Sequence, residues 1–206
     1  NSWNSITEET VTATPGAAGK AKGSQINMHK LVGETAPPPR LSTGIPEMDR
    51  VLGGGLVPGS ATLIGGDPGI GKSTLLLQTL CKMAMAGQDA AYFSGEESVE
   101  QIRMRGSRLG LAANDMPLGL ATSTNAADIT ASLYTAQPVA VAVIDSIQTM
   151  FLPSIESSPG TVSQVRASAF ELIRAAKAKG LARALARSAT RCCLLLLLLL
   201  FHLLFL

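Results

Sequence analysis

The residues best suited to chemistry lie in one glycine-rich stretch, which matches the pattern G-x-x-x-x-G-K-[ST]. In such a loop, glycines let successive backbone N–H groups surround phosphate oxygens. Lys72 would reach the β- and γ-phosphates, and the Ser73 hydroxyl would bind Mg²⁺. The stretch therefore predicts ATP and Mg²⁺ as ligands; the alternative is a glycine-rich turn that contains Lys-Ser by chance. The predicted phosphate-binding residues are Gly66, Asp67, Pro68, Gly69, Ile70, Gly71, Lys72, Ser73 and Thr74.

Carboxylates elsewhere in the chain follow apolar runs. Asp145 ends the run of residues 139–144, a position typical of an aspartate that holds Mg²⁺, often through water. The alternative role for Asp145 is to cap a helix. Glu96 and Glu97 follow a second apolar run, and one of them would orient or deprotonate the attacking water. We favour Glu96, and the alternative is that both acids begin a helix. Gln148, three residues after Asp145, is a candidate sensor of the γ-phosphate.

The elements that must position these residues alternate between strand and helix. Apolar runs at residues 61–64, 90–94, 118–122 and 139–144 predict strands, because strands buried on both faces read this way. Helices are expected at residues 43–52, 74–86, 98–109, 125–134 and 161–179, the fourth of them capped by Asn125. This order predicts an α/β fold with a mainly parallel sheet flanked by helices. Ligands of such sheets bind at the carboxyl ends of the strands, where the P-loop, Glu96 and Asp145 all fall.

Composition narrows the class of protein further. The chain has 206 residues, enough for one α/β domain, and a formal net charge of +2, too small to indicate nucleic acid by itself. Its three cysteines, Cys81, Cys192 and Cys193, form no C-x-x-C pair. An odd number of thiols without such spacing indicates a reducing compartment, so we expect a cytoplasmic protein. Cys81 is expected to be a small core residue.

Several specific stretches occur together and in order. They are LSTGIPEMDRVLGGG at 41–55, GGDPGIGKSTLLLQ at 65–78, YFSGEES at 92–98, DSIQT at 145–149 and SPGTVSQVR at 158–166. Over residues 40–180 the chain resembles the RadA (Sms) family of bacterial DNA repair proteins, which are RecA-like P-loop ATPases. The resemblance implies a DNA-stimulated ATPase of recombinational repair that binds single-stranded or branched DNA, promotes branch migration and assembles into homo-oligomeric rings.

The resemblance also assigns roles to residues. It places Glu96 at the position of the catalytic glutamate, beside the P-loop Lys72. The loop of residues 151–160 would face the DNA channel, and Arg166 in the next helix would contact DNA phosphate or, alternatively, be a solvated helix residue.

The chain departs from the family pattern at both ends. Residues 1–39 are expected to be a disordered linker after a missing zinc module, so no zinc site is predicted. Residues 40–180 would form a partial RecA-like core, incomplete at its C-terminal end, and the Lon-like C-terminal domain of the family is absent. Residues 181–206 are an atypical leucine-rich tail.

Three alternatives remain for the 15 residues from 192 to 206. They are the aberrant end of a gene fragment, a membrane-associated tail, or an apolar segment that replaces a missing sheet strand. As a helix this segment would span about 22 Å, short of the roughly 30 Å of a bilayer core, so we expect no membrane partner.

Two other functions fit parts of the pattern. One is a KaiC-like or DnaB-like RecA-fold ATPase, which would carry the same P-loop. The other is a nucleotide-binding fragment that does not hydrolyse ATP, because the later strands and any basic residue supplied by a neighbouring subunit would be missing.

Overall fold

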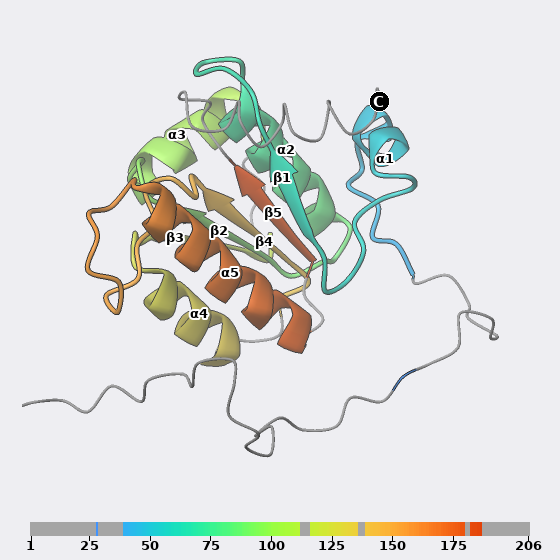
Figure 1. The fold of residues 1–206 in the computed structure, drawn as a ribbon. Helices are drawn as coiled ribbons and strands as arrows, with labels where there is room; N and C mark the ends of the chain where they lie inside the picture. Colours follow the sequence, from blue (N-terminus) through green and yellow to red (C-terminus); the bar gives the residue numbers. More distant parts are fainter. Residues whose placement is uncertain (1–27, 29–38, 112–115, 136–138, 180–181, 187–206) are drawn as a thin grey trace, which may run out of the picture. The chain divides into compact units, whose positions relative to one another are not determined.

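The computed structural model describes residues 28, 39–111, 116–135, 139–179 and 182–186 (Figure 1). The chain divides into a unit of residues 1–36, of which Met28 alone is described, and a unit of residues 37–206. All the helices and strands discussed below belong to the second unit. The predicted linker, except Met28 and Pro39, lies outside the described residues, as does the leucine-rich segment with Cys192 and Cys193.

Five parallel strands form one sheet in the order β1-β5-β4-β2-β3 (Figure 1). They are β1 (Ala61–Ile64), β2 (Ala90–Ser94), β3 (Leu118–Thr122), β4 (Val141–Asp145) and β5 (Ala182–Ala186). All of β2 and the first four residues of β4 are buried, as their unbroken apolar sequences predict for strands covered on both faces. The four strands expected from the sequence are confirmed to within two residues at each end.

Helices cover both faces of this sheet. They are α2 (Lys72–Met85) and α3 (Val99–Arg108) on one face, and α4 (Ala126–Thr135) and α5 (Val162–Lys179) on the other (Figure 1). Because side chains alternate across a strand, Tyr92 of β2 packs in the core against α2, while its neighbour Phe93 packs against α4 and α5. The fold is therefore the three-layer α/β arrangement that the sequence predicted.

Local signals account for where several helices begin. Pro46 is at the first position of the short helix α1 (Pro46–Val51), where the missing N–H has no partner to lose. Ser98 and Gln101 form a capping box at the start of α3. The Asn125 side chain accepts the Ala127 N–H at 3.0 Å, which confirms its predicted cap on α4.

Strand β5 was not expected. The core was expected to end at residue 180, whereas Ala182–Ala186 pairs with β1 on one side and with β4 on the other. The Ala-rich sequence of this segment carries little strand signal, but pairing uses backbone N–H and C=O groups that any residue except proline supplies. The chain thus has a central strand after the residue at which the core was expected to stop.

Within the described ranges, every helix falls short of the length and apolar content that a membrane crossing needs.

Candidate nucleotide-binding site

The P-loop joins β1 to α2, as its sequence predicts. Gly69 and Gly71 have φ values of +78° and +99°, a left-handed backbone that favours glycine. A Cβ atom at either position would meet no heavy atom within 4 Å. Glycine is therefore favoured there by the backbone conformation and not by a lack of space. The loop is therefore shaped and open in the way that backbone N–H groups need in order to surround a phosphate.

Lys72 lies across this loop. Its Nζ donates to the carbonyl oxygens of Gly66, at 2.9 Å, and Asp67, at 2.7 Å. The first turn of α2 contains no acidic residue that would neutralise the lysine or the positive end of the helix. Ser73 and Thr74 are half-buried in the same turn. This donor set fits the phosphates of a nucleoside triphosphate, with the Ser73 hydroxyl in the helix turn where a phosphate-bound Mg²⁺ would find it.

Asp145 is the last residue of β4. Its carboxylate accepts a hydrogen bond from the hydroxyl of Tyr92, a side chain with no solvent exposure. Burial first, and then the Asp145 charge, raise the pKa of this hydroxyl far above its ordinary value, so that it stays protonated and donates. No helix begins behind Asp145 in the described chain until α5, so the capping alternative finds no support there.

One strand separates the P-loop from Asp145. Ile64 of β1 is level with Ala186 of β5, and Ile144 of β4 is level with Leu185. Because neighbouring strands lie about 4.8 Å apart, the ends of β1 and β4 are roughly 10 Å apart at the same edge of the sheet. The P-loop that follows β1 and Asp145 at the end of β4 are therefore on the same edge of the sheet.

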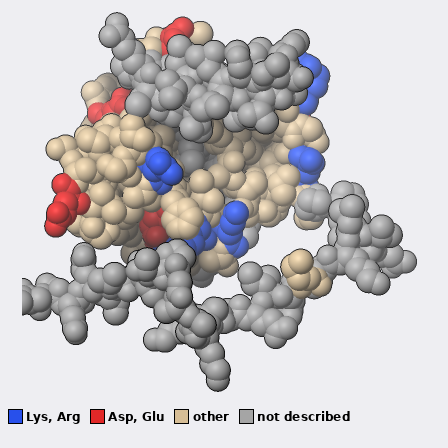
Figure 2. Space-filling view, viewed as in Figure 1, with Lys and Arg blue, Asp and Glu red and all other residues tan. Residues whose placement is uncertain are grey.

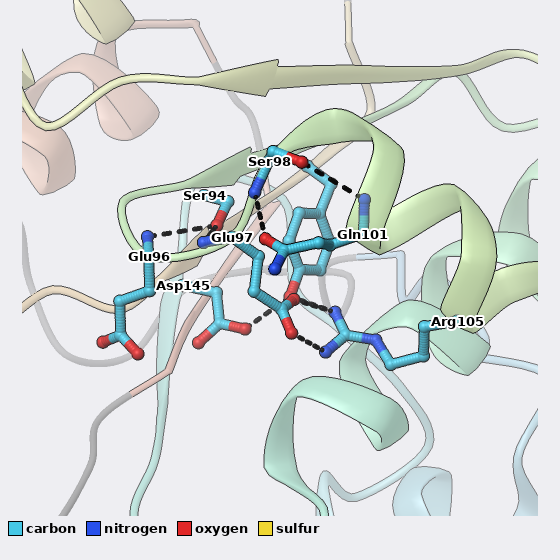
Figure 3. Close-up of polar contacts among 8 residues, drawn as sticks. Ser94, Glu96, Glu97, Ser98, Gln101, Arg105 and Asp145 are labelled. Atoms are coloured by element: carbon cyan, nitrogen blue, oxygen red, sulfur yellow. Dashed lines mark hydrogen bonds and ion pairs between the residues drawn. The ribbon is translucent and has the colours of Figure 1, made fainter.

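Glu96 and Glu97 have different surroundings (Figure 3). Glu97 forms an ion pair with Arg105 at 2.7 Å. The carboxylate of Glu96 is exposed and accepts a hydrogen bond from the Ser146 hydroxyl at 2.7 Å. Their backbone N–H groups both donate to the Ser94 side chain, which turns the chain after β2. Both acids precede α3, so neither is in its first turn, contrary to the alternative considered from the sequence.

Sequence reasoning missed three residues of this site. Tyr92, Arg105 and Ser146 hold the carboxylates described above, and their partners lie up to 53 residues away in the chain. One signal was present, because a tyrosine inside a fully buried strand needs a hydrogen-bond partner for its hydroxyl. Its position two residues before the end of β2 puts that partner near the ligand edge.

The other predicted residues lie farther along the chain. Gln148 is half-buried in the turn after β4, and Arg166 is exposed on α5. The loop of residues 151–160 is held by Gln164, a fully buried side chain that sequence reasoning also missed. Its amide nitrogen donates to the carbonyls of Leu152, Ile155 and Ser157, and its oxygen accepts the Leu152 N–H at 2.9 Å.

Metal ligation by protein side chains alone is not offered by the described residues. They contain no group of three or more His, Cys, Asp or Glu side chains that could hold an ion.

Comparison with known proteins shows what the chain is similar to. A family model described as "ATPase: KaiC" matches residues 41–117. The chain superimposes on a KaiC-like protein of the archaeon Pyrococcus horikoshii OT3 with a TM-score of 0.62, covering 74% of this chain and 73% of that chain at 22% identity. That likeness confirms the RecA-like fold.

Several curated proteins are more similar to this chain in sequence than the superimposed structure is. The chain is 49% identical to the DNA repair protein RadA of Pseudomonas aeruginosa, over 87% of this chain. It is 46% identical to that of Escherichia coli over 88% and 44% identical to that of Brucella abortus over 92%. The chain is a relative of the RadA proteins. It spans 42% of the length of the Brucella abortus RadA and 40% of the other two. The RadA resemblance predicted from the motifs is thereby confirmed.

Proposed function

We propose that this chain is the ATP-binding core of a DNA-stimulated ATPase that acts in DNA repair and recombination. The observation that carries the proposal is the meeting of three features at one edge of the sheet. These are the P-loop after β1, Asp145 at the end of β4, and Glu96 after β2. The KaiC-type family match supports ATP as the nucleotide, and the RadA relatives support a role in DNA repair.

Each residue then has a defined task. The backbone N–H groups of residues 66–74 and the Lys72 ammonium bind the phosphates, and Lys72 exchanges its two carbonyl partners for phosphate oxygens. Ser73 and Asp145 hold Mg²⁺, which neutralises charge that develops on the phosphates. Glu96, held by Ser146, orients or deprotonates the attacking water, and Gln148 senses the γ-phosphate.

Glu97 does not take the role of the base in this proposal. Its carboxylate is occupied by Arg105, whereas that of Glu96 faces solvent beside the strand ends. The assignment of Glu96 as the catalytic carboxylate rests on this difference.

The proposed partner is single-stranded or branched DNA, bound by a ring of several copies of the chain. The contacts would come from the loop of residues 151–160 and from Arg166. On the face drawn in Figure 2, the Lys and Arg side chains of the described residues lie at several separate places. Affinity for DNA would therefore come from repeating a modest charge around a ring. The proposed location is the cytoplasm.

The test is binding and turnover of Mg²⁺-ATP by the chain, with and without single-stranded DNA. Lys72→Ala should weaken ATP binding by more than about tenfold, because it removes the only side-chain cation of the P-loop. Lys177→Ala, at an exposed position of α5, is the matched control. ATP binding by Lys72→Ala equal to that of the unaltered chain would refute the proposed site.

A second function is favoured by one observation. Both the family model and the superimposed structure are KaiC-like, so a RecA-fold ATPase that works without DNA is the other candidate. ATP turnover that is unchanged by single-stranded or branched DNA, together with intact ATP binding, would select it.

A further inference from the structure

A chain of four polar side chains runs behind the site, from α3 to the end of β4. Its members are Glu97, Arg105, Tyr92 and Asp145 (Figure 3). Three of them come from one segment, residues 92–105, and the fourth comes from the neighbouring strand β4. The predicted Mg²⁺ ligand Asp145 is thereby connected to a helix that carries no predicted ligand of the nucleotide.

Tyr92 is the central member of this chain. In the β2–β4 register it is level with Val143, two residues before Asp145, so the side chains of Tyr92, Val143 and Asp145 share one face of the sheet. The Tyr92 ring packs in the core, and its hydroxyl reaches the Oδ2 atom of Asp145. No described residue donates a hydrogen bond to Oδ1, which leaves that oxygen for a metal or for water bound to it.

Arg105 holds Tyr92 from the other side. Its guanidinium donates to the Tyr92 hydroxyl oxygen at 3.3 Å and to the Glu97 carboxylate at 2.8 Å. The Arg105 side chain is only 13% exposed, so both contacts are largely shielded from water. Because Glu97 balances the charge of Arg105, the charge of Asp145 is left for a cation in the site.

We propose that Tyr92 is a positioning residue for Mg²⁺ binding. It fixes the Asp145 carboxylate so that Oδ1 faces the metal of the bound nucleotide, and Arg105 with Glu97 keeps Tyr92 in place. The proposal rests on the proposed function, because it takes Asp145 as a ligand of Mg²⁺. Partners that orient a metal ligand commonly change metal affinity by about ten- to a hundredfold when they are lost.

The experiment measures the affinity of the full chain for a fluorescent ATP analogue as the free Mg²⁺ concentration is varied. Tyr92→Phe keeps the ring and removes the hydroxyl. It should raise by about tenfold the free Mg²⁺ concentration at which half of the Mg²⁺-dependent change in nucleotide affinity is reached. The nucleotide affinity measured in excess EDTA should stay unchanged. Tyr134→Phe, on α4 at the opposite face of the sheet, is the matched control, and Asp145→Asn shows the full loss of the Mg²⁺ effect.

A second variant covers the case in which Tyr92→Phe does not fold. Arg105→Lys keeps the charge but loses the fork that contacts two partners, and it should shift the Mg²⁺ dependence in the same direction. A Mg²⁺ dependence within twofold of the unaltered chain in a folded Tyr92→Phe or, failing that, in Arg105→Lys would overturn the proposal. Failure of the unaltered chain to bind the Mg²⁺-nucleotide would instead refute the proposed function, so the two failures are distinguishable.

Discussion

Glu96 and Glu97 are neighbours in sequence, and yet only Glu97 is paired with a cation, Arg105, while the exposed Glu96 accepts a hydrogen bond from Ser146. The difference comes from residues that no local pattern connects to them. Ser146 lies 50 positions after Glu96, and Arg105, on α3, lies eight positions after Glu97. Two adjacent carboxylates after a strand therefore have different surroundings because of the partners that the fold brings to each.

This difference predicts opposite effects of two matched substitutions. Glu96→Gln should lower ATP turnover by about a hundredfold or more while ATP binding is retained, because the group that acts on water is lost. Glu97→Gln should change turnover by less than about fivefold, but it should lower the free energy of unfolding by about 1–3 kcal/mol, because Arg105 loses its charged partner. Steady-state kinetics and denaturant unfolding measure both, and the reverse pattern would assign the base to Glu97.

Asp49 of α1 predicts a dependence of stability on pH. Burial by itself raises the pKa of this carboxyl, but hydrogen bonds from the Ser42 hydroxyl and from the Thr43 N–H and hydroxyl outweigh it, so the net pKa is lowered. A carboxyl with a lowered pKa in the folded state stabilises the fold above its unfolded pKa, and that contribution disappears as the pH falls through the folded pKa.

The stability difference between the unaltered chain and Asp49→Asn should therefore be largest near neutral pH. It should shrink as the pH falls below about 4 and through the lowered pKa of the folded state, because below that pKa the carboxyl is protonated in both states. Urea unfolding at a series of pH values measures it. A difference that stays constant or grows in acid would contradict this account of Asp49.

At the scale of elements, Gln164 connects α5 to the loop that precedes it. An amide nitrogen has two hydrogens, and here it lies within hydrogen-bond distance of three carbonyl oxygens, so at least one hydrogen is shared. The loop of residues 151–157 is thus tied to a buried group and not only to its own backbone. A loop held in this way keeps one shape before any partner arrives.

Gln164→Ala should release this loop. Hydrogen exchange of residues 152–157 should become faster, and the free energy of unfolding should fall by about 2 kcal/mol, because buried carbonyls lose their donor. Nucleotide affinity should change little, since Gln164 contacts none of the residues predicted to bind it. Lys177→Ala, at an exposed position farther along α5, is the control. Unchanged exchange in the loop would show that other contacts shape it.

The elements that the sequence predicted correctly are those whose apolar pattern is strong. Strands β2 and β4 and helices α4 and α5 have long runs or clear caps, and the ligand edge follows from their order. The position of Gln164 and the Tyr92–Asp145 contact depend instead on tertiary packing, which pairs residues 12 and 53 positions apart. Strand β5 was missed because its alanines carry no strand preference. It forms because its backbone pairs with β1 on one side and with β4 on the other.

For the whole molecule, β5 is the element that joins the two parts of the sheet. On one side lies β1 with the P-loop, and on the other lie β4, β2 and β3 with the carboxylates. No other strand contacts both β1 and β4 in the described sheet. The distance between the P-loop and Asp145, the proposed Mg²⁺ ligand, is therefore set by this one strand.

A proline in β5 tests this role. Ala184 is paired with Thr62 of β1 and Val143 of β4, so Ala184→Pro removes a backbone donor in the centre of the sheet. The free energy of unfolding should fall by about 3 kcal/mol or more, and Mg²⁺-ATP binding should be lost with it. Ala184→Ser keeps the N–H group and should retain binding. A chain with Ala184→Pro that binds Mg²⁺-ATP normally would show that β5 is dispensable.

The place of β5 also affects how the chain folds as it is made. Among the described strands it is the last in sequence and a central one in space, so a ribosome releases β1, β2, β3 and β4 before the strand that joins them exists. Until residues 182–186 emerge, β1 and one side of β4 present open edges, which can pair with other chains. The interval is short when synthesis proceeds at about 5–20 residues per second, but any pause before residue 182 would lengthen it. Nascent chains arrested at that point should be the form most dependent on chaperones.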